Sequence, residues 1–259
     1  MIKLISLTAL FSLSLLCSFA QLDKIDTDRP DQTESVGIVP KKWMQFEMGF
    51  MKETERTYRT LKDSYFQHPS LLTKYGLAKC FELRLITEVA TIKEENVNGT
   101  NIKTGISSVQ LGGKVNLFGE KGIRPKISLL AHYDFARLRT MYKDSVDGFN
   151  FRFTMQHTLS KVISLGYNLG MEWDRFGSPP AYIYTFSPGF NIGEKWYAYI
   201  EAFGFIWKDY SPENSIDGGV AYHINDHLKL DVSGGFGLNK KAPDYYFALG
   251  ASFRFKACK

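Results

Sequence analysis

The chain has 259 residues, of which 44% are hydrophobic, 23% charged and 15% aromatic. The charged fraction excludes a bundle of membrane helices, and the aromatic fraction excludes an unfolded chain. Lys and Arg number 32 against 27 Asp and Glu, which gives a net charge of +5. The basic residues are dispersed and form no basic block, so we do not expect a nucleic-acid partner.

The first twenty residues have the organisation of a secretory signal peptide. Lys3 precedes an apolar stretch from Leu4 to Leu16, and Ser18-Phe19-Ala20 places small residues at the positions that signal peptidase reads. The apolar stretch is shorter than the roughly 20 residues of a membrane helix. We therefore expect cleavage after Ala20 and export. A lipoprotein cut before Cys17 is the alternative, but a leucine precedes that cysteine where a small residue is expected.

Segments of about ten residues alternate apolar and polar side chains along the rest of the chain. In the segment 43–51, Met44, Phe46 and Met48 alternate with Gln45 and Glu47. Successive side chains of a strand face opposite sides, so each segment has one apolar and one polar face. The pattern predicts twelve strands, with a bulge at Pro188 in the eighth. They lie at 43–51, 70–78, 81–91, 108–118, 124–136, 149–160, 162–173, 181–192, 196–207, 215–224, 228–238 and 245–256.

The predicted connections alternate in length. Longer loops are expected at 52–69, 92–107, 137–148, 174–180, 208–214 and 239–244. The connections between them have five residues or fewer, at 79–80, 119–123, 161, 193–195 and 225–227. Longer loops at one end and tight turns at the other are typical of an even-stranded outer-membrane barrel.

The apolar faces of the twelve strands carry no Asp, Glu, Lys or Arg, and His157 is their one ionisable residue. A face toward hydrocarbon requires this, whereas a soluble core merely favours it. Aromatic residues stand near the ends of these faces, as in a headgroup girdle: Trp43, Trp173, Tyr182, Trp196, Tyr245 and Phe255. The predicted fold class is all-β, an antiparallel up-and-down transmembrane β-barrel of about 12 strands. A soluble all-β protein is the alternative.

Four parts follow from this pattern: a signal peptide (1–20), a polar N-terminal arm (21–42), the barrel (43–256) and a short C-terminal tail (257–259). The arm carries several aspartates around Arg29. One hypothesis is that it folds into the periplasmic mouth as a plug, with Arg29 meeting lumenal carboxylates such as Glu47 or Glu82. The alternative is a loose periplasmic tail.

The polar faces carry charges of both signs, and together with the arm they supply the candidate functional residues. These charges could form salt bridges that fill the barrel, or line a polar path. Twelve strands lie between eight, whose interior side chains can fill, and sixteen, which leave a channel, so we expect a narrow or plugged pore. The candidates for the lumen and the plug are Asp28, Arg29, Asp31, Glu34, Glu47, Glu82, Arg84, Glu88, Lys114, Arg152, Glu172 and Arg254.

Two segments carry a family resemblance. Residues 26–35 read Asp-Thr-Asp-Arg-Pro-Asp-Gln-Thr-Glu-Ser, Val39-Pro40 and Gln45-Phe46-Glu47-Met48-Gly49-Phe50 follow, and Phe81-Glu82-Leu83-Arg84-Leu85 comes later. The chain thus resembles the outer-membrane proteins of the phenol-degradation meta-pathway (MetA-pathway), or transporter, family of Bacteroidetes-like bacteria. The resemblance implies a barrel that moves small, often apolar or aromatic, molecules. Val36 stands where the family often has proline, and the chain continues past Phe255, where barrels usually end.

An outer-membrane lipid-modifying enzyme is the main rival class. Such an enzyme needs a serine and a histidine in contact on the outer face, but Ser107 and His157 are expected at opposite ends of it. His132 faces the lumen without a nucleophile in contact. We expect no catalysis, no cofactor and no metal. The acidic arm lacks the glycine and terminal glutamate of a calcium loop.

The predicted function is passage or uptake of a small, apolar or aromatic solute across the outer membrane. A structural barrel with a closed lumen is a further alternative. The expected partners are outer-membrane lipid, the small-molecule solute and the barrel-assembly machinery, and the expected state is a monomer. Cys80 and Cys258 could pair or stay as separate thiols.

Overall fold

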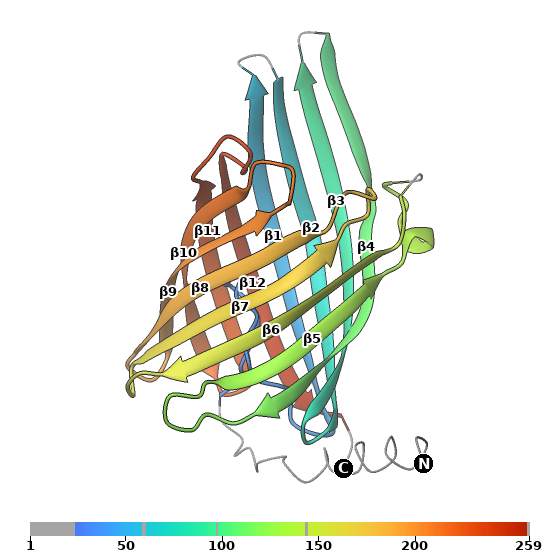
Figure 1. Ribbon diagram of the computed structural model, residues 1–259. Coiled ribbons are helices and arrows are strands. Elements are labelled where there is room, and N and C mark those ends of the chain that lie inside the picture. The colour runs from blue at the N-terminus through green and yellow to red at the C-terminus, as the bar shows by residue number, and fades with distance from the viewer. Residues whose placement is uncertain (1–23, 59–60, 97, 143–144, 258–259) are drawn as a thin grey trace, which may run out of the picture.

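The computed structural model describes residues 24–58, 61–96, 98–142 and 145–257. Twelve antiparallel strands close into one barrel, in which each strand pairs with the next in sequence and β12 pairs with β1 (Figure 1). The predicted fold class is confirmed. No helix in the described part of the chain is long and apolar enough to cross a membrane.

The strand bounds are β1 (Trp43–Tyr58), β2 (Leu61–Ala78), β3 (Phe81–Asn96), β4 (Gly99–Phe118), β5 (Lys126–Asp134), β6 (Gly148–Thr158), β7 (Ile163–Trp173), β8 (Ala181–Ile192), β9 (Trp196–Ile206), β10 (Glu213–Asn225), β11 (Leu228–Gly237) and β12 (Tyr245–Lys256). A short 3-10 helix, η1 (Ala136–Leu138), lies between β5 and β6. We call the end where β1 begins the arm end, and the opposite end the hairpin end.

The first four strands are longer than predicted. The expected loops at 52–69 and 92–107 consist largely of strand, and the β1–β2 and β3–β4 hairpins rise above the rest of the barrel (Figure 1). Alternation failed as a guide here because both faces of a projecting hairpin meet water. The regular strand β3 carries three consecutive charged residues, Lys93, Glu94 and Glu95. Such a polar run is typical of a loop, which is why a loop was predicted there.

The bulge predicted at Pro188 is wrong. Pro188 pairs in register with Leu165 of β7. Toward β9, the pairs Phe186–Ala202 and Gly189–Tyr199 keep one register across the proline. A proline removes one hydrogen-bond donor but does not require an extra residue, so the strand continues without a shift. Register shifts occur elsewhere, for example between Gly49 and Met51 and between Glu88 and Val89.

The barrel is apolar outside and polar inside. Val232 and Leu249 pair near the middle of β11 and β12 and are 51% and 57% exposed. Glu82, Arg84 and Lys114 point inward and are almost fully buried. A soluble all-β protein would bury the apolar face instead, so this arrangement favours a hydrocarbon surround. Aromatic side chains expected in the girdle are exposed on the outside, among them Trp173, Tyr182, Trp196 and Phe255.

The outer face predicts how the barrel responds to a charge. We expect Val232→Arg, near the middle of β11, to lower the free energy of unfolding by about 2–4 kcal/mol in lipid, because the guanidinium would sit in hydrocarbon. Leu238→Arg, just past the end of β11, should cost about 0–1 kcal/mol. Urea unfolding from phosphatidylcholine vesicles measures both, and equal effects would contradict a lipid-facing Val232.

Candidate functional site

The N-terminal arm lies inside the barrel rather than beside it. It begins at the β10–β11 turn, where the Ile25 N–H donates to the carbonyl of Asp226. It then reaches a tip at residues 30–33 against β8 and β9. It returns past β7, β5 and β3 to Lys42 at the start of β1, so it forms a loop within the arm-end half of the lumen.

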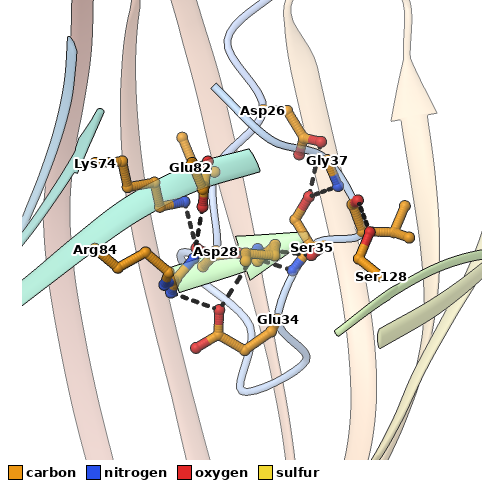
Figure 2. A network of polar contacts seen from close by, with 12 residues as sticks. Asp26, Asp28, Glu34, Ser35, Gly37, Lys74, Glu82, Arg84 and Ser128 are labelled. Atoms are coloured by element: carbon orange, nitrogen blue, oxygen red, sulfur yellow. Dashed lines mark hydrogen bonds and ion pairs between the residues drawn. The ribbon is translucent and has the colours of Figure 1, made fainter. Parts of the chain in front are cut away.

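The centre of the arm is one aspartate held by three cations. Asp28 lies 2.8 Å from Arg84 Nη1 and also pairs with Lys74 (Figure 2). Its third cation is Lys114, whose Nζ lies 2.9 Å away. Lys74 and Arg84 are direct neighbours across β2 and β3, and Lys114 opposes Glu82 across β3 and β4. Strand register therefore brings the three cations to one level of the wall. Burial raises the pKa of the Asp28 carboxyl, but the three cations outweigh it and hold that pKa well below its usual range.

A second arm carboxylate completes this cluster. Glu34 Oε2 lies 2.8 Å from Arg84 Nη2 and 3.8 Å from Lys114 Nζ. Arg84 also donates from Nε to His132 Nε2 at 2.9 Å, so that ring nitrogen accepts and His132 is an orienting partner for the guanidinium. We call Asp28, Glu34, Lys74, Arg84 and Lys114 the Asp28 cluster. All its cations are buried, and the arm supplies two of the carboxylates that pair with them.

Arg29 meets a different carboxylate from those predicted. Its Nη2 pairs with Asp231 of β11 at 2.9 Å, and not with Glu47 or Glu82. Glu47 instead accepts from the backbone N–H groups of Asp28 and Arg29, at 2.9 and 3.2 Å. Glu82 accepts from the backbone N–H of Val39 at 2.7 Å and from Arg84.

Two glycines explain the path of the Arg29 side chain. Gly49 and Gly250 are paired across β1 and β12, where the barrel closes. A Cβ at Gly49 would lie 2.1 Å from Arg29 Nη1, and a Cβ at Gly250 would lie 2.3 Å from Arg29 Nε. The guanidinium therefore fills a notch that any larger residue would occupy. This contact was not predicted, because nothing in the sequence relates these glycines to the arm.

The tip of the arm is held mainly by uncharged donors. The Gln32 N–H donates to Glu201 at 2.7 Å, and the hydroxyls of Thr33 and Thr185 are 2.6 Å apart. Asp31 accepts from Ser187 at 3.2 Å and from Tyr197 at 3.1 Å. Burial raises the pKa of the Asp31 carboxyl to about 6, against the lowering effect of Lys229.

The remaining candidates lie at three levels of the lumen. Arg152 donates to the carbonyl of Gln32 at 3.1 Å, at the tip. Glu88 lies above the arm, where Tyr65, Gln67 and Ser107 donate to it, and Glu172 lines the same space. Arg254 lies at the arm-end rim and donates to the carbonyl of Asp226 at 3.2 Å.

Lys74 was missed by the sequence analysis, although it pairs with Asp28 and lies 2.5 Å from Glu47. Leu72 shares its lumenal face, since it opposes Glu47 in the register, and this apolar residue obscured the alternation. A lysine within an otherwise regular strand was the available signal.

Two cavities of the lumen, lined by described residues, lie on opposite sides of the arm tip. One, of about 690 Å³, lies toward the hairpin end, and Gln32 contributes to its lining. The other, of about 390 Å³, lies toward the arm end, and Asp31 and Thr33 line it with hydroxyls from β6 to β8. We call them the hairpin-end cavity and the arm-end cavity. The lumen is therefore divided by the arm rather than filled by side chains of the wall.

Ser107 does not lie on the outer face, contrary to prediction. It is fully buried and donates to Glu88, because the register shift between Glu88 and Val89 turns it inward. His157 contacts the Tyr167 hydroxyl at 3.2 Å. Among the described residues, no group of three or more His, Cys, Asp or Glu side chains is arranged to hold a metal. Cys80 is disulfide-bonded, and Cys17 and Cys258 lie outside the described residues.

The family model described as "Putative MetA-pathway of phenol degradation" matches residues 27–255. The chain belongs to this family. The match begins inside the arm and ends at the last aromatic residue of β12, so it covers most of the arm as well as the MetA-pathway barrel. No curated protein matches the chain in sequence.

Solved structures share the fold of this MetA-pathway protein at low identity. The COG4313 outer membrane channel from Pseudomonas putida F1 has a TM-score of 0.66 at 11% identity, over 90% of this chain and 100% of that one. The KdgM porin in complex with disordered oligogalacturonate has a TM-score of 0.53 at 8% identity, over 82% and 99%. The translocator domain of the autotransporter NalP from Neisseria meningitidis has 0.53 at 9%, over 97% and 95%. The fold is that of outer-membrane barrels.

The Asp28 cluster predicts a strong effect of removing its central cation. We expect Arg84→Ala to lower the free energy of unfolding by about 3–5 kcal/mol, because Asp28, Glu34 and Glu82 would keep buried charges with one partner fewer. Denaturant titration in detergent measures the loss. Arg124→Ala, at the exposed β4–β5 turn, is the matched control and should change little.

The glycine notch predicts a second effect, on the position of the arm. We expect Gly250→Val to expel the Arg29 side chain from the seam without altering any charge, so that an aspartate-specific endoprotease cuts the arm at Asp26 and Asp28 faster than in the wild type. Gly113→Val is the control, since a Cβ there meets the Phe81 ring rather than any residue of the arm. Equal cleavage rates in all three proteins would contradict a sterically held arm.

Proposed function

We propose that this MetA-pathway protein is an outer-membrane channel for small solutes, with its N-terminal arm as a plug inside the lumen. In this proposal the signal peptide is removed, the monomeric barrel is inserted by the assembly machinery, and the arm end faces the periplasm. The tight turns at the arm end and the tall hairpins at the other end agree with this orientation.

The observation that carries the proposal is the pair of cavities divided by a polar arm. A structural barrel has no need of a space of about 690 Å³ on one side of a segment and about 390 Å³ on the other. The arm tip between them is joined to the wall by hydroxyl, amide and carboxylate groups. Water can replace each such contact at little cost, so the tip can leave the wall in a way that an apolar plug could not.

The root and the tip of the arm are held unequally. At the root, Asp28 has three buried ion pairs. At the tip, residues 30–33 take part in none of the described ion pairs, and the neighbouring Arg29 has one, with Asp231. Release of the tip therefore breaks fewer charged contacts than release of the root. We infer that the channel opens by displacement of residues 30–33 while Asp28 stays anchored.

The family description and the similar structures indicate the kind of cargo. The family is named for phenol degradation, and the similar structures include an outer membrane channel and a porin solved with an oligogalacturonate. These names favour a small solute, with an apolar or aromatic one as the family's suggestion. We propose no enzymatic step. Ser107 donates a hydrogen bond to Glu88 and His157 contacts Tyr167, so the serine and the histidine do not form a catalytic pair.

A reversible lock on the tip tests the channel. Because the Thr33 and Thr185 hydroxyls are 2.6 Å apart, Thr33→Cys/Thr185→Cys can form a disulfide between the arm tip and β8. In planar bilayers we expect the oxidised variant to conduct at least severalfold less than the same protein after reduction. Wild type with and without the reductant controls for the native disulfide at Cys80.

Deletion of residues 24–35 is the companion measurement, and its conductance should exceed that of the wild type. If the locked, reduced and arm-deleted proteins conduct equally, the arm is no plug. If all of them are silent while folded, as judged by heat-modifiable mobility on a gel, the channel proposal fails and a closed structural barrel is favoured.

A further inference from the structure

The hairpin-end cavity has a strongly one-sided charge, in contrast to the arm below it. Its lining includes seven carboxylates and a single guanidinium, that of Arg175. Arg175 lies at the wall of the cavity, where it donates to the carbonyl of Ser107 at 2.7 Å and lies over the Tyr142 ring. The carboxylates come from β1, β2, β3, β7 and β10, so they surround the space rather than cluster on one wall: Glu53, Glu55, Asp63, Glu88, Glu94, Glu172 and Glu213.

Among the described residues, no cation contacts these carboxylates in an ion pair, although Lys241 acts on Glu55 and Glu213 from a longer distance. Among the described ion pairs of the chain, none includes Glu53, Glu55 or Glu213. Lys52, Lys62 and Lys93 alternate with inward residues on the same strands and so face outward. Lys103 opposes the inward Ile92 across β3 and β4, and its Nζ lies 5.7 Å from the centre of the Tyr142 ring. The carboxylates of the Asp28 cluster, by contrast, each have at least one cation within hydrogen-bond distance. The unpaired charges thus belong to the cavity and not to the packing of the wall.

The lining of the same cavity also includes apolar and aromatic side chains. Phe203 and Phe205 share the lumenal face of β9 with Glu201, and Met51 and Ile92 face them from β1 and β3. A pore built only for water and ions has no use for four such side chains. Aromatic faces attract cations as well as apolar groups, so the acidic and the aromatic side chains of the lining are compatible with a single kind of solute.

From these observations we propose that the solute admitted at the hairpin end is a small organic cation, an ammonium group on an apolar or aromatic body. The ring of carboxylates attracts the ammonium group, and Phe203, Phe205 and their neighbours receive the body. Rings of carboxylates give pores a preference for cations. The carboxylates form no metal-binding group among the described residues, so the preference is for a diffuse positive charge and not for one coordinated ion. The inference deepens the proposed function and rests on it for passage, but not for binding.

Thiol labelling measures the field of the cavity without any need for conduction. Ser215 faces the cavity, and Ser215→Cys introduces a thiol of similar size. We expect a cationic methanethiosulfonate to modify this thiol faster than an anionic one at pH 8, by on the order of tenfold after each rate is normalised to that of free cysteine. Glu53→Gln, Glu55→Gln and Glu213→Gln together should bring the ratio close to one. Glu120→Gln with Glu194→Gln, at the arm-end turns, should leave it unchanged, and wild type reports any reaction of native cysteines.

Three ring compounds of nearly equal size then test the solute class. Benzylammonium should protect the Ser215→Cys thiol from an uncharged thiol reagent better than benzyl alcohol, and benzoate should protect least. If benzyl alcohol protects as well as benzylammonium, or if the two charged reagents react at equal normalised rates, the proposal is overturned. Silent bilayers with cation-selective labelling would instead reject the channel and keep the cation site, so the two failures are distinguishable.

Discussion

The structure depends on a constraint of charge burial. Lys74, Arg84 and Lys114 are directed into the lumen of a barrel that is surrounded by apolar side chains, and all three are almost completely buried. A buried cation is tolerated only when it is paired and hydrogen-bonded. Glu47 and Glu82 supply part of that pairing from the wall, and Asp28 and Glu34 of the arm supply the rest. The arm is therefore part of the polar core of the barrel.

This inverted core also explains why the outer face could be read from sequence. A face toward hydrocarbon excludes charge almost absolutely, so period-two alternation without Asp, Glu, Lys or Arg is a stringent pattern. It gave the twelve strands, the closed antiparallel order and the all-β class correctly. The family followed from two short segments, one of which, residues 26–35, forms the arm loop inside the lumen.

The same criterion failed wherever the hydrocarbon ended. Residues 52–69 and 92–107 lie largely in the tall hairpins, where water on both faces removes the alternation although the strand continues. Ser107 was assigned to the wrong face because a single register shift, between Glu88 and Val89, reverses the alternation that the prediction assumed. Partners within the lumen were beyond this kind of reasoning, since Asp231 lies 202 residues from Arg29 and meets it only because the barrel closes.

The lumen is divided into zones whose charges are treated differently. At the level of the arm, each cation of the Asp28 cluster has a carboxylate partner, and the backbone N–H groups of Asp28, Gln32, Glu34 and Val39 find acceptors on the wall. Toward the hairpin end, the carboxylates of the cavity take part in none of the described ion pairs, although Lys and Arg are more numerous than Asp and Glu in the chain as a whole.

Net composition therefore cannot account for the acidic cavity; placement does. Glu53 and Glu55 lie on the inward face of β1 that also carries Glu47, while Lys52, next to Glu53, lies on the outward face. The inward face of β1 therefore has two roles. Glu47 pairs with a cation and binds the arm, whereas Glu53 and Glu55 contribute negative charge to the cavity. Glu47 binds the arm by accepting hydrogen bonds from the backbone N–H groups of Asp28 and Arg29. Glu53 and Glu55 keep a negative electrostatic field in the cavity, and a solute from the hairpin end passes through that field before it reaches the arm.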